Sequence, residues 1–168
     1  YLLADQPEPP KYFAMMKKLN KVDRPLLTEV PDHKRLTNDE FKDAMAKGMK
    51  VIDTRSKAAF AEGHIPGSIN IQGNNAFATW AGWFLNYEES FILIAEKGQM
   101  NDLTRKLMRI GLDNIYGYIT TNVEDTGIAL EKNEVISIEE FKTLLDKKDV
   151  QVVDVRGVAE FNTAHVKG

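Results

Sequence analysis

Two sets of side chains that could do chemistry follow one another in the same order along the chain. They are Asp53, Arg55 and His64, and then, 101 residues later, Asp154, Arg156 and His165. An aspartate at the end of a strand can accept backbone N–H groups, and an arginine can pair with a carboxylate across a loop. A histidine can act as a base or bind a metal. The remaining histidine, His33, supplies no second ligand at a metal-binding spacing, so we expect structural roles and no metal site in this chain.

The composition excludes several kinds of function. Cysteine is absent, which excludes disulfides, thiolate metal sites and a cysteine nucleophile. The 22 basic and 25 acidic residues give a net charge of −3, which argues against nucleic acid and anionic membrane surfaces as partners. No apolar run approaches the ~18 residues of a membrane span. The chain opens without a signal peptide and without a methionine, so we expect a cytoplasmic location and a piece of a longer protein.

Alternating helix and strand patterns run from residue 34 to residue 120. Capping signals and periodicity predict helices over residues 38–47, 56–61, 76–87 and 101–110. Short apolar runs predict strands over residues 49–53, 68–71, 91–94 and 114–116. The run Phe91–Ile94 is the most apolar, so it is expected to be central. This alternation predicts an α/β fold with a mainly parallel sheet that helices cover on both faces.

The pattern then starts again after a polar linker over residues 121–134. The capping pair Thr37 and Glu40 reappears as Ser137 and Glu140, and Phe60 reappears as Phe161. The capping pair, the strand pattern, the charged pair and the histidine thus recur in the same order and at nearly the same spacing. This agreement indicates an internal duplication whose second copy is cut short.

The segment Val51–Arg55, followed by Phe60 and Gly63–Ile71, resembles the first signature of the rhodanese family. That signature is a strand ending in Asp-x-Arg, a short helix and then Gly-His-Ile-Pro-Gly-Ala. The resemblance implies a mainly parallel five-stranded sheet in a rhodanese-like domain over residues 34–130. Residues 131–168 are then the start of a truncated second rhodanese domain, and the motif residues of both copies are expected to hold the fold.

In rhodaneses, a cysteine at the end of the central strand carries sulfur as a persulfide, inside a loop of the form Cys-x-x-Gly-x-Arg-Ser. The corresponding loop here is Ala95, Glu96, Lys97, Gly98, Gln99 and Met100. Alanine takes the place of the nucleophile and methionine that of the arginine, so the resemblance implies a degenerate site, with no catalytic residue, no cofactor and no sulfurtransferase activity in this chain. Glu96 and Asp102 either cap the following helix or line a retained pocket for a neutral or basic group.

Residues 1–33 are rich in proline and contain one predicted amphipathic helix, from Pro10 to about Asn20. The stretch from Pro9 to Phe13 is similar to the helix that closes the metallo-β-lactamase domain of bacterial persulfide dioxygenases, so residues 1–33 are expected to be the tail of such an upstream domain. Some of those proteins carry an inactive rhodanese domain followed by an active one.

The leading hypothesis is therefore the non-catalytic part of a persulfide dioxygenase/sulfurtransferase fusion. It implies non-haem iron or zinc in an upstream domain, a downstream rhodanese domain, a low-molecular-weight persulfide or thiosulfate as substrate, and a homo-oligomer. The alternatives are a free-standing protein-binding module and part of a thioester-hydrolase-type metallo-β-lactamase-fold protein. Aromatic residues on two faces of the helix predicted over residues 76–87 also suggest a docking surface for a neighbouring domain.

Overall fold

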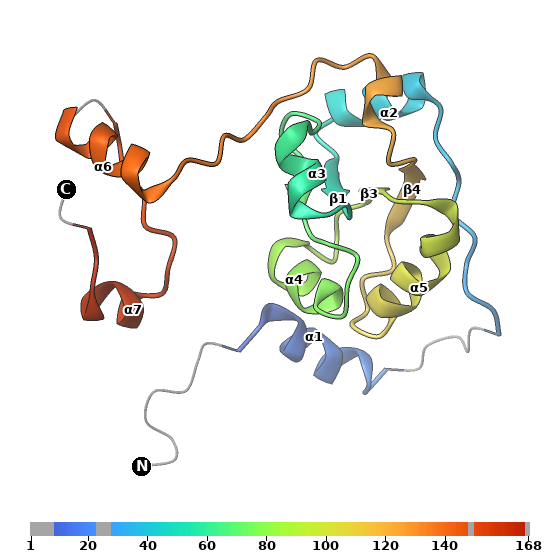
Figure 1. Ribbon diagram of the computed structural model, residues 1–168. Helices are drawn as coiled ribbons and strands as arrows, with labels where there is room; N and C mark the ends of the chain where they lie inside the picture. The colour runs from blue at the N-terminus through green and yellow to red at the C-terminus, as the bar shows by residue number, and fades with distance from the viewer. Residues whose placement is uncertain (1–8, 23–27, 148–149, 167–168) are drawn as a thin grey trace, which may run out of the picture. The chain divides into compact units, whose positions relative to one another are not determined.

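A parallel sheet lies at the centre of the first of two units, residues 1–133 and 134–168, into which the chain divides (Figure 1). The structure is a computed structural model that describes residues 9–22, 28–147 and 150–166. The strands are β1 (Lys50–Asp53), β2 (Ile69–Asn70), β3 (Phe91–Ile94) and β4 (Ile115–Ile119), and their order is β2-β1-β3-β4. β3 is buried along its whole length between β1 and β4, which confirms the prediction that the most apolar strand is central.

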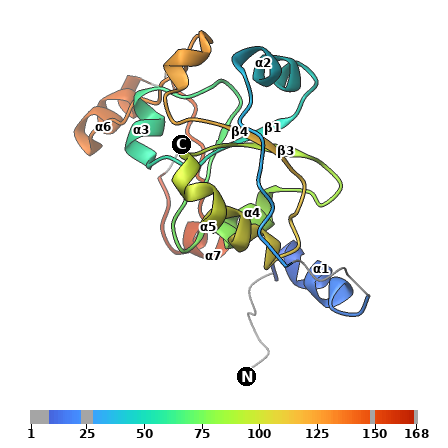
Figure 2. The same ribbon diagram turned by 90° about the vertical axis from the view of Figure 1, so that its right-hand side faces the viewer.

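Helices cover both faces of the sheet, as predicted (Figure 2). On one face lies α2 (Asn38–Ala46), and on the other lie α4 (Phe77–Phe84) and α5 (Lys97–Met108). The remaining helices of this unit are α1 (Lys11–Leu19), α3 (Lys57–Glu62) and the 3₁₀ turn η1 (Val123–Thr126). Successive residues of a strand point to opposite faces, so Ile92 joins the cluster under α2 whereas Leu93 joins the cluster under α4 and α5. Along the described ranges, no helix is long and apolar enough to cross a bilayer.

The sheet has four strands over the described residues, so the prediction of five was wrong. Beside these four strands, Arg35 forms one isolated parallel bridge with Tyr118 of β4. Leu36 N–H donates to the Tyr118 carbonyl at 2.8 Å, and Tyr118 N–H donates to the Lys34 carbonyl at 3.0 Å. The pairing stops there because Thr37 is already the N-cap of α2, so the chain turns away from the sheet after one residue pair.

Several elements begin or end at other residues than predicted. α5 starts at Lys97 rather than at Asn101, because only Ala95 and the extended N-cap residue Glu96 separate the end of β3 from the helix. α4 stops at Phe84 because Leu85 is extended, with φ −95° and ψ 144°. β4 continues to Ile119, since the bridge to Arg35 and the pairing with β3 hold its last residues.

The second unit contains α6 (Ile138–Lys147) and α7 (Val158–Thr163). Its predicted capping box is present, since Glu140 N–H donates to Ser137 Oγ at 3.2 Å and Ser137 N–H donates to the Glu140 carboxylate at 2.7 Å. Residues 152–156, predicted as a strand from their likeness to β1, are not in a strand. A strand is stable only with neighbours, and the described residues of this unit offer none to pair with.

Candidate functional site

The Asp-x-Arg pair, Asp53 and Arg55, lies at the carboxyl end of β1. The Asp53 carboxylate is fully buried and accepts hydrogen bonds from Arg55 N–H at 2.9 Å and from the Arg55 guanidinium at 2.7–3.1 Å. The same guanidinium also donates to the Gly63 carbonyl at 2.8 Å. Arg55 therefore joins the end of β1 to the turn that follows α3, and all contacts of this buried pair lie within the fold.

His64 is held from several sides. Its Nδ1 lies 2.9 Å from the Phe60 carbonyl, and its ring stacks on the Phe60 ring with centroids 3.9 Å apart. Its backbone N–H and carbonyl each pair with Glu131 at 2.9 Å, and its Nε2 lies 3.8 Å from the Glu131 carboxylate. Both ring nitrogens thus face protein groups of the same unit. Across the described ranges, no group of three histidine, aspartate or glutamate side chains could hold a metal ion.

The second unit repeats this hydrogen-bond pattern. The Arg156 guanidinium donates to the Asp154 carboxylate at 2.6–3.2 Å and to the Ala164 carbonyl at 2.8 Å. His165 Nδ1 lies 2.8 Å from the Phe161 carbonyl, and the two rings stack with centroids 4.0 Å apart. Hydrogen bonds from Arg156 lower the pKa of Asp154 to about 2. The duplicated residues therefore make duplicated contacts, but here the set is exposed rather than buried.

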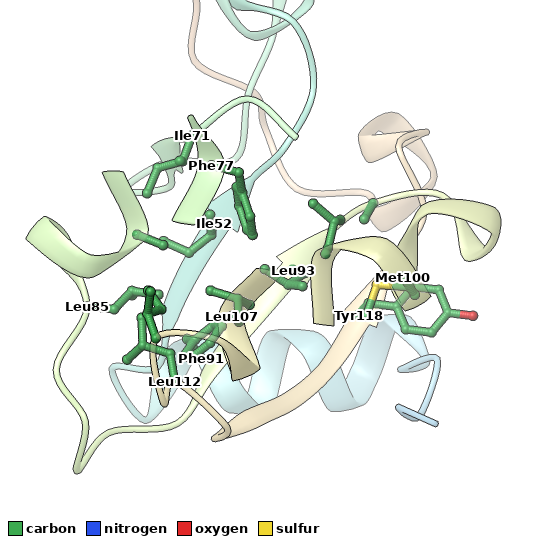
Figure 3. Close-up of a cluster of buried hydrophobic side chains, with 14 residues drawn as sticks. Ile52, Ile71, Phe77, Leu85, Phe91, Leu93, Met100, Leu107, Leu112 and Tyr118 are labelled. Carbon is green, nitrogen blue, oxygen red and sulfur yellow. The ribbon is translucent and has the colours of Figure 1, made fainter. Parts of the chain in front are cut away.

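The place of the catalytic cysteine of rhodaneses is filled by hydrophobic core. Ala95 is fully buried at the end of β3, where its N–H donates to the Ile119 carbonyl at 3.0 Å. Met100, in the place of the arginine, is only 6% exposed and lies in the same buried cluster as Leu93 and Leu107 (Figure 3). A methyl group and a thioether supply neither the thiolate that carries sulfur in rhodaneses nor the cation beside it.

The residues between Ala95 and Met100 form the first turn of α5 rather than an open loop. Gln99 N–H donates to the Glu96 carbonyl at 2.9 Å, and the Gln99 amide oxygen accepts from Glu96 N–H at 3.4 Å. The Glu96 carboxylate accepts from the Thr121 hydroxyl at the end of β4. Gly98 lies inside the helix with open space beside it. Lys97 is exposed.

Asp102 does not join Glu96 in a shared acidic pocket. Its carboxylate forms an ion pair with Lys106 at 2.7 Å, one turn further along α5. Lys106 also donates to the Asn74 carbonyl at 3.1 Å, which connects α5 to the loop before α4. The two carboxylates that the sequence placed together therefore have separate partners, and both belong to the exposed side of α5.

The aromatic residues of α4 divide between core and solvent. Phe77 is fully buried, whereas Trp80 and Phe84 are 54% and 50% exposed with ring centroids 6.4 Å apart. These two rings line a hollow of about 310 Å³ together with residues 70–72 and Asn74. Of these three aromatic residues of α4, only Phe77 is buried in the core.

A parallel sheet with an Asp-x-Arg pair and a histidine turn at the end of β1 defines a rhodanese-type α/β domain. Residues 37–120 match the family model described as the rhodanese-like domain, and the chain belongs to that family. No curated protein matches the chain.

The chain is similar to several solved structures. It is 36% identical to part of a metallo-beta-lactamase from Staphylococcus aureus subsp. aureus COL, with a TM-score of 0.61 over 71% of this chain, and it spans about a third of that protein, 33%. It shares the fold, at 15% identity and a TM-score of 0.50, with the Alr3790 protein from Anabaena sp., covering 67% of this chain and 92% of that one. An EanB variant in complex with hercynine has 16% identity and a TM-score of 0.52, covering 76% of this chain and 35% of that one.

Proposed function

We propose that this chain is the rhodanese-like portion of a metallo-β-lactamase–rhodanese fusion that acts on low-molecular-weight persulfides or thiosulfate. One observation carries the proposal: the chain is 36% identical, over 71% of its length, to part of a protein described as a metallo-beta-lactamase. The domain over residues 34–130 is the non-catalytic member of this fusion.

The core at Ala95 and Met100 supports the non-catalytic role. Persulfide transfer needs a thiolate and a cationic or N–H-lined site that stabilises it. Here both positions are apolar and almost fully buried. In this proposal the domain therefore does not transfer sulfur; it packs against the other domains of the fusion and holds them in position. Sulfur chemistry then belongs to the upstream domain, with a non-haem iron or zinc, and to a downstream rhodanese domain.

The second unit fits the start of that downstream domain. It carries the contacts of the first copy, yet its apolar side chains Val153 and Val155 are 71% and 92% exposed. Exposed valines on an unpaired segment favour association with further polypeptide, of this chain or of another copy in a homo-oligomer. The proposal places the fusion in the cytoplasm.

A second candidate function is a protein-binding module, because Trp80 and Phe84 expose half of their surfaces on α4. Aromatic side chains of this size are enriched at protein interfaces. In this alternative, the domain recognises a separate partner instead of serving a fused enzyme.

The test is made on the protein as its native cell produces it. Intact mass, metal content and oxygen uptake with a low-molecular-weight persulfide are measured on the purified protein. The proposal expects a mass well above 19.0 kDa, bound iron or zinc, and oxygen uptake that depends on the persulfide. A native protein of about that mass without metal and without oxygen uptake would contradict the fusion and favour the binding module.

A further inference from the structure

Helix α1 meets the rhodanese-like domain at two glycines. The Tyr12 ring lies directly on Gly82 in the middle of α4, where an added Cβ would lie 2.9 Å from Tyr12 Cγ and still closer to Cδ1. At the other end of α1, the Leu19 side chain lies on Gly111, where a Cβ would overlap Leu19 Cδ1. Real Cβ atoms do not approach other carbons so closely, so the contact of Tyr12 with Gly82 requires glycine. At Gly111 the overlap is with the flexible end of Leu19, and the positive φ of 76° is what favours glycine.

The same face of α1 adds to the hydrophobic core. Tyr12, Met16 and Leu19 are spaced as one side of a helix, and the first two pack against the buried cluster under α4 and α5. Tyr87, whose hydroxyl donates to the Ile110 carbonyl at 2.8 Å, lies beside Gly111. Burial, with smaller contributions from Tyr12 and Asp113, raises the pKa of Tyr87.

Gly82 has no other evident reason to be glycine. It is buried inside α4 and its φ is negative, so its backbone does not require glycine. Glycine weakens a helix interior relative to alanine, so a glycine at this position indicates a close neighbour. The neighbour in the structure is Tyr12, which lies outside residues 37–120 that match the family.

We propose that α1 is a permanently docked extension of the rhodanese-like domain, seated on Gly82 and Gly111. The occupant of this surface is thus residues 11–19 of the chain itself. That the polypeptide before α1 belongs to a metallo-β-lactamase-like domain rests on the proposed function, whereas the docking does not.

The experiment compares amide hydrogen exchange of residues 13–19 in the 168-residue chain and in matched variants. Gly82→Ala is expected to speed exchange in α1 by about tenfold or more, because the new methyl group displaces the Tyr12 ring. Gly98→Ala is the control: it makes the same change inside α5, where nothing lies within 4 Å, and should leave α1 unchanged. Tyr12→Ala removes the ring and should free α1 even if Gly82→Ala does not fold.

The double variant isolates the steric contact. Adding Gly82→Ala to Tyr12→Ala should have a much smaller effect on α1 exchange than Gly82→Ala alone, since the ring is gone and only the 3.2 Å approach to the Cβ of residue 12 remains. Unprotected α1 amides in the parent chain, unchanged exchange in Gly82→Ala, or equal effects of Gly82→Ala and Gly98→Ala would each overturn the proposal. If the proposed function failed its own test, for example because the native protein contained no metal, the exchange rates expected here would be the same.

Discussion

Replacing Met100 with arginine should damage the domain instead of repairing its chemistry. In rhodaneses, an arginine at this place belongs to the sulfur-binding loop. Here the side chain lies in the hydrophobic cluster and is 6% exposed. The guanidinium of Met100→Arg would therefore enter the core beside Leu93 and Leu107 without a carboxylate partner there.

The size of the effect follows from the lost apolar contact and the unpaired charge. Leaving a charge buried without its partner costs about 3–5 kcal/mol. A whole domain is stable by only about 5–15 kcal/mol, so this is a large part of the total. Each 1 kcal/mol lowers Tm by roughly 4–8 °C in a domain of this size, so the expected fall in Tm exceeds about 12 °C.

Urea unfolding measures the change in the free energy of unfolding, and two variants serve as controls. Met108→Arg makes the same substitution on α5 at a partly exposed position and should change the free energy by less than about 1 kcal/mol. Met100→Leu keeps the volume and the apolar character, so a loss below about 1.5 kcal/mol is expected.

The same variant can be combined with Ala95→Cys and assayed for thiosulfate sulfurtransfer. Burial raises the pKa of a thiol, so a cysteine at this fully buried position should stay protonated and inert. If Met100→Arg is as stable as the parent chain and the double variant transfers sulfur, then an open sulfur-binding loop exists and our description of this site is wrong.

Three further results are expected. Arg55→Ala leaves the Asp53 carboxylate buried without its partner and should cost about 3–5 kcal/mol, measured by urea unfolding, whereas Arg156→Ala in the exposed copy should leave the unfolding transition unchanged. Burial lowers the pKa of His33 below 6.5, and among the described residues its Nε2 has no hydrogen-bond partner. The folded state then binds fewer protons than the unfolded chain, so stability should fall as the pH drops below about 7.5 and through the lowered pKa of His33 in the folded state, and His33→Gln should remove this part of the dependence. Gly117→Ala should weaken the bridge at Arg35, seen as faster exchange of the Leu36 amide, because a Cβ there would lie 2.7 Å from the Lys34 carbonyl.

Local signals in the sequence predicted the elements around β1 well. Thr37 and Glu40 form their predicted capping box, and the Asp53–Arg55 pair lies at the end of a buried strand. These features depend on neighbours a few residues away in the sequence, so the sequence determines them locally. Strand pairing depends on distant residues: residues 152–156 carry the pattern of β1 but have no neighbouring strand among the described residues of their unit, so they do not form a strand.

The candidate site shows where sequence patterns are insufficient. The substitutions at Ala95 and Met100 predict a degenerate site from the sequence alone, and the family pattern suggested a loop up to Met100. Gly98 had marked a loop, whereas the structure places it inside α5. Once the cysteine and arginine are apolar, both side chains pack in the core, and nothing keeps the segment open. The packing of α1 on α4 was not predicted either, although a glycine inside an aromatic helix, Gly82, was a signal for a close neighbour.

The central claim is that the rhodanese site has become hydrophobic core and binds no sulfur anion. The most direct test is a titration of the 168-residue chain with thiosulfate while the backbone amide signals of residues 95–100 are followed by NMR. We predict no saturable change in these signals, because Met100 fills the site and the Glu96 carboxylate stands at the start of α5. Saturable shifts confined to these amides would mean that an anion-binding loop persists, and would contradict the account.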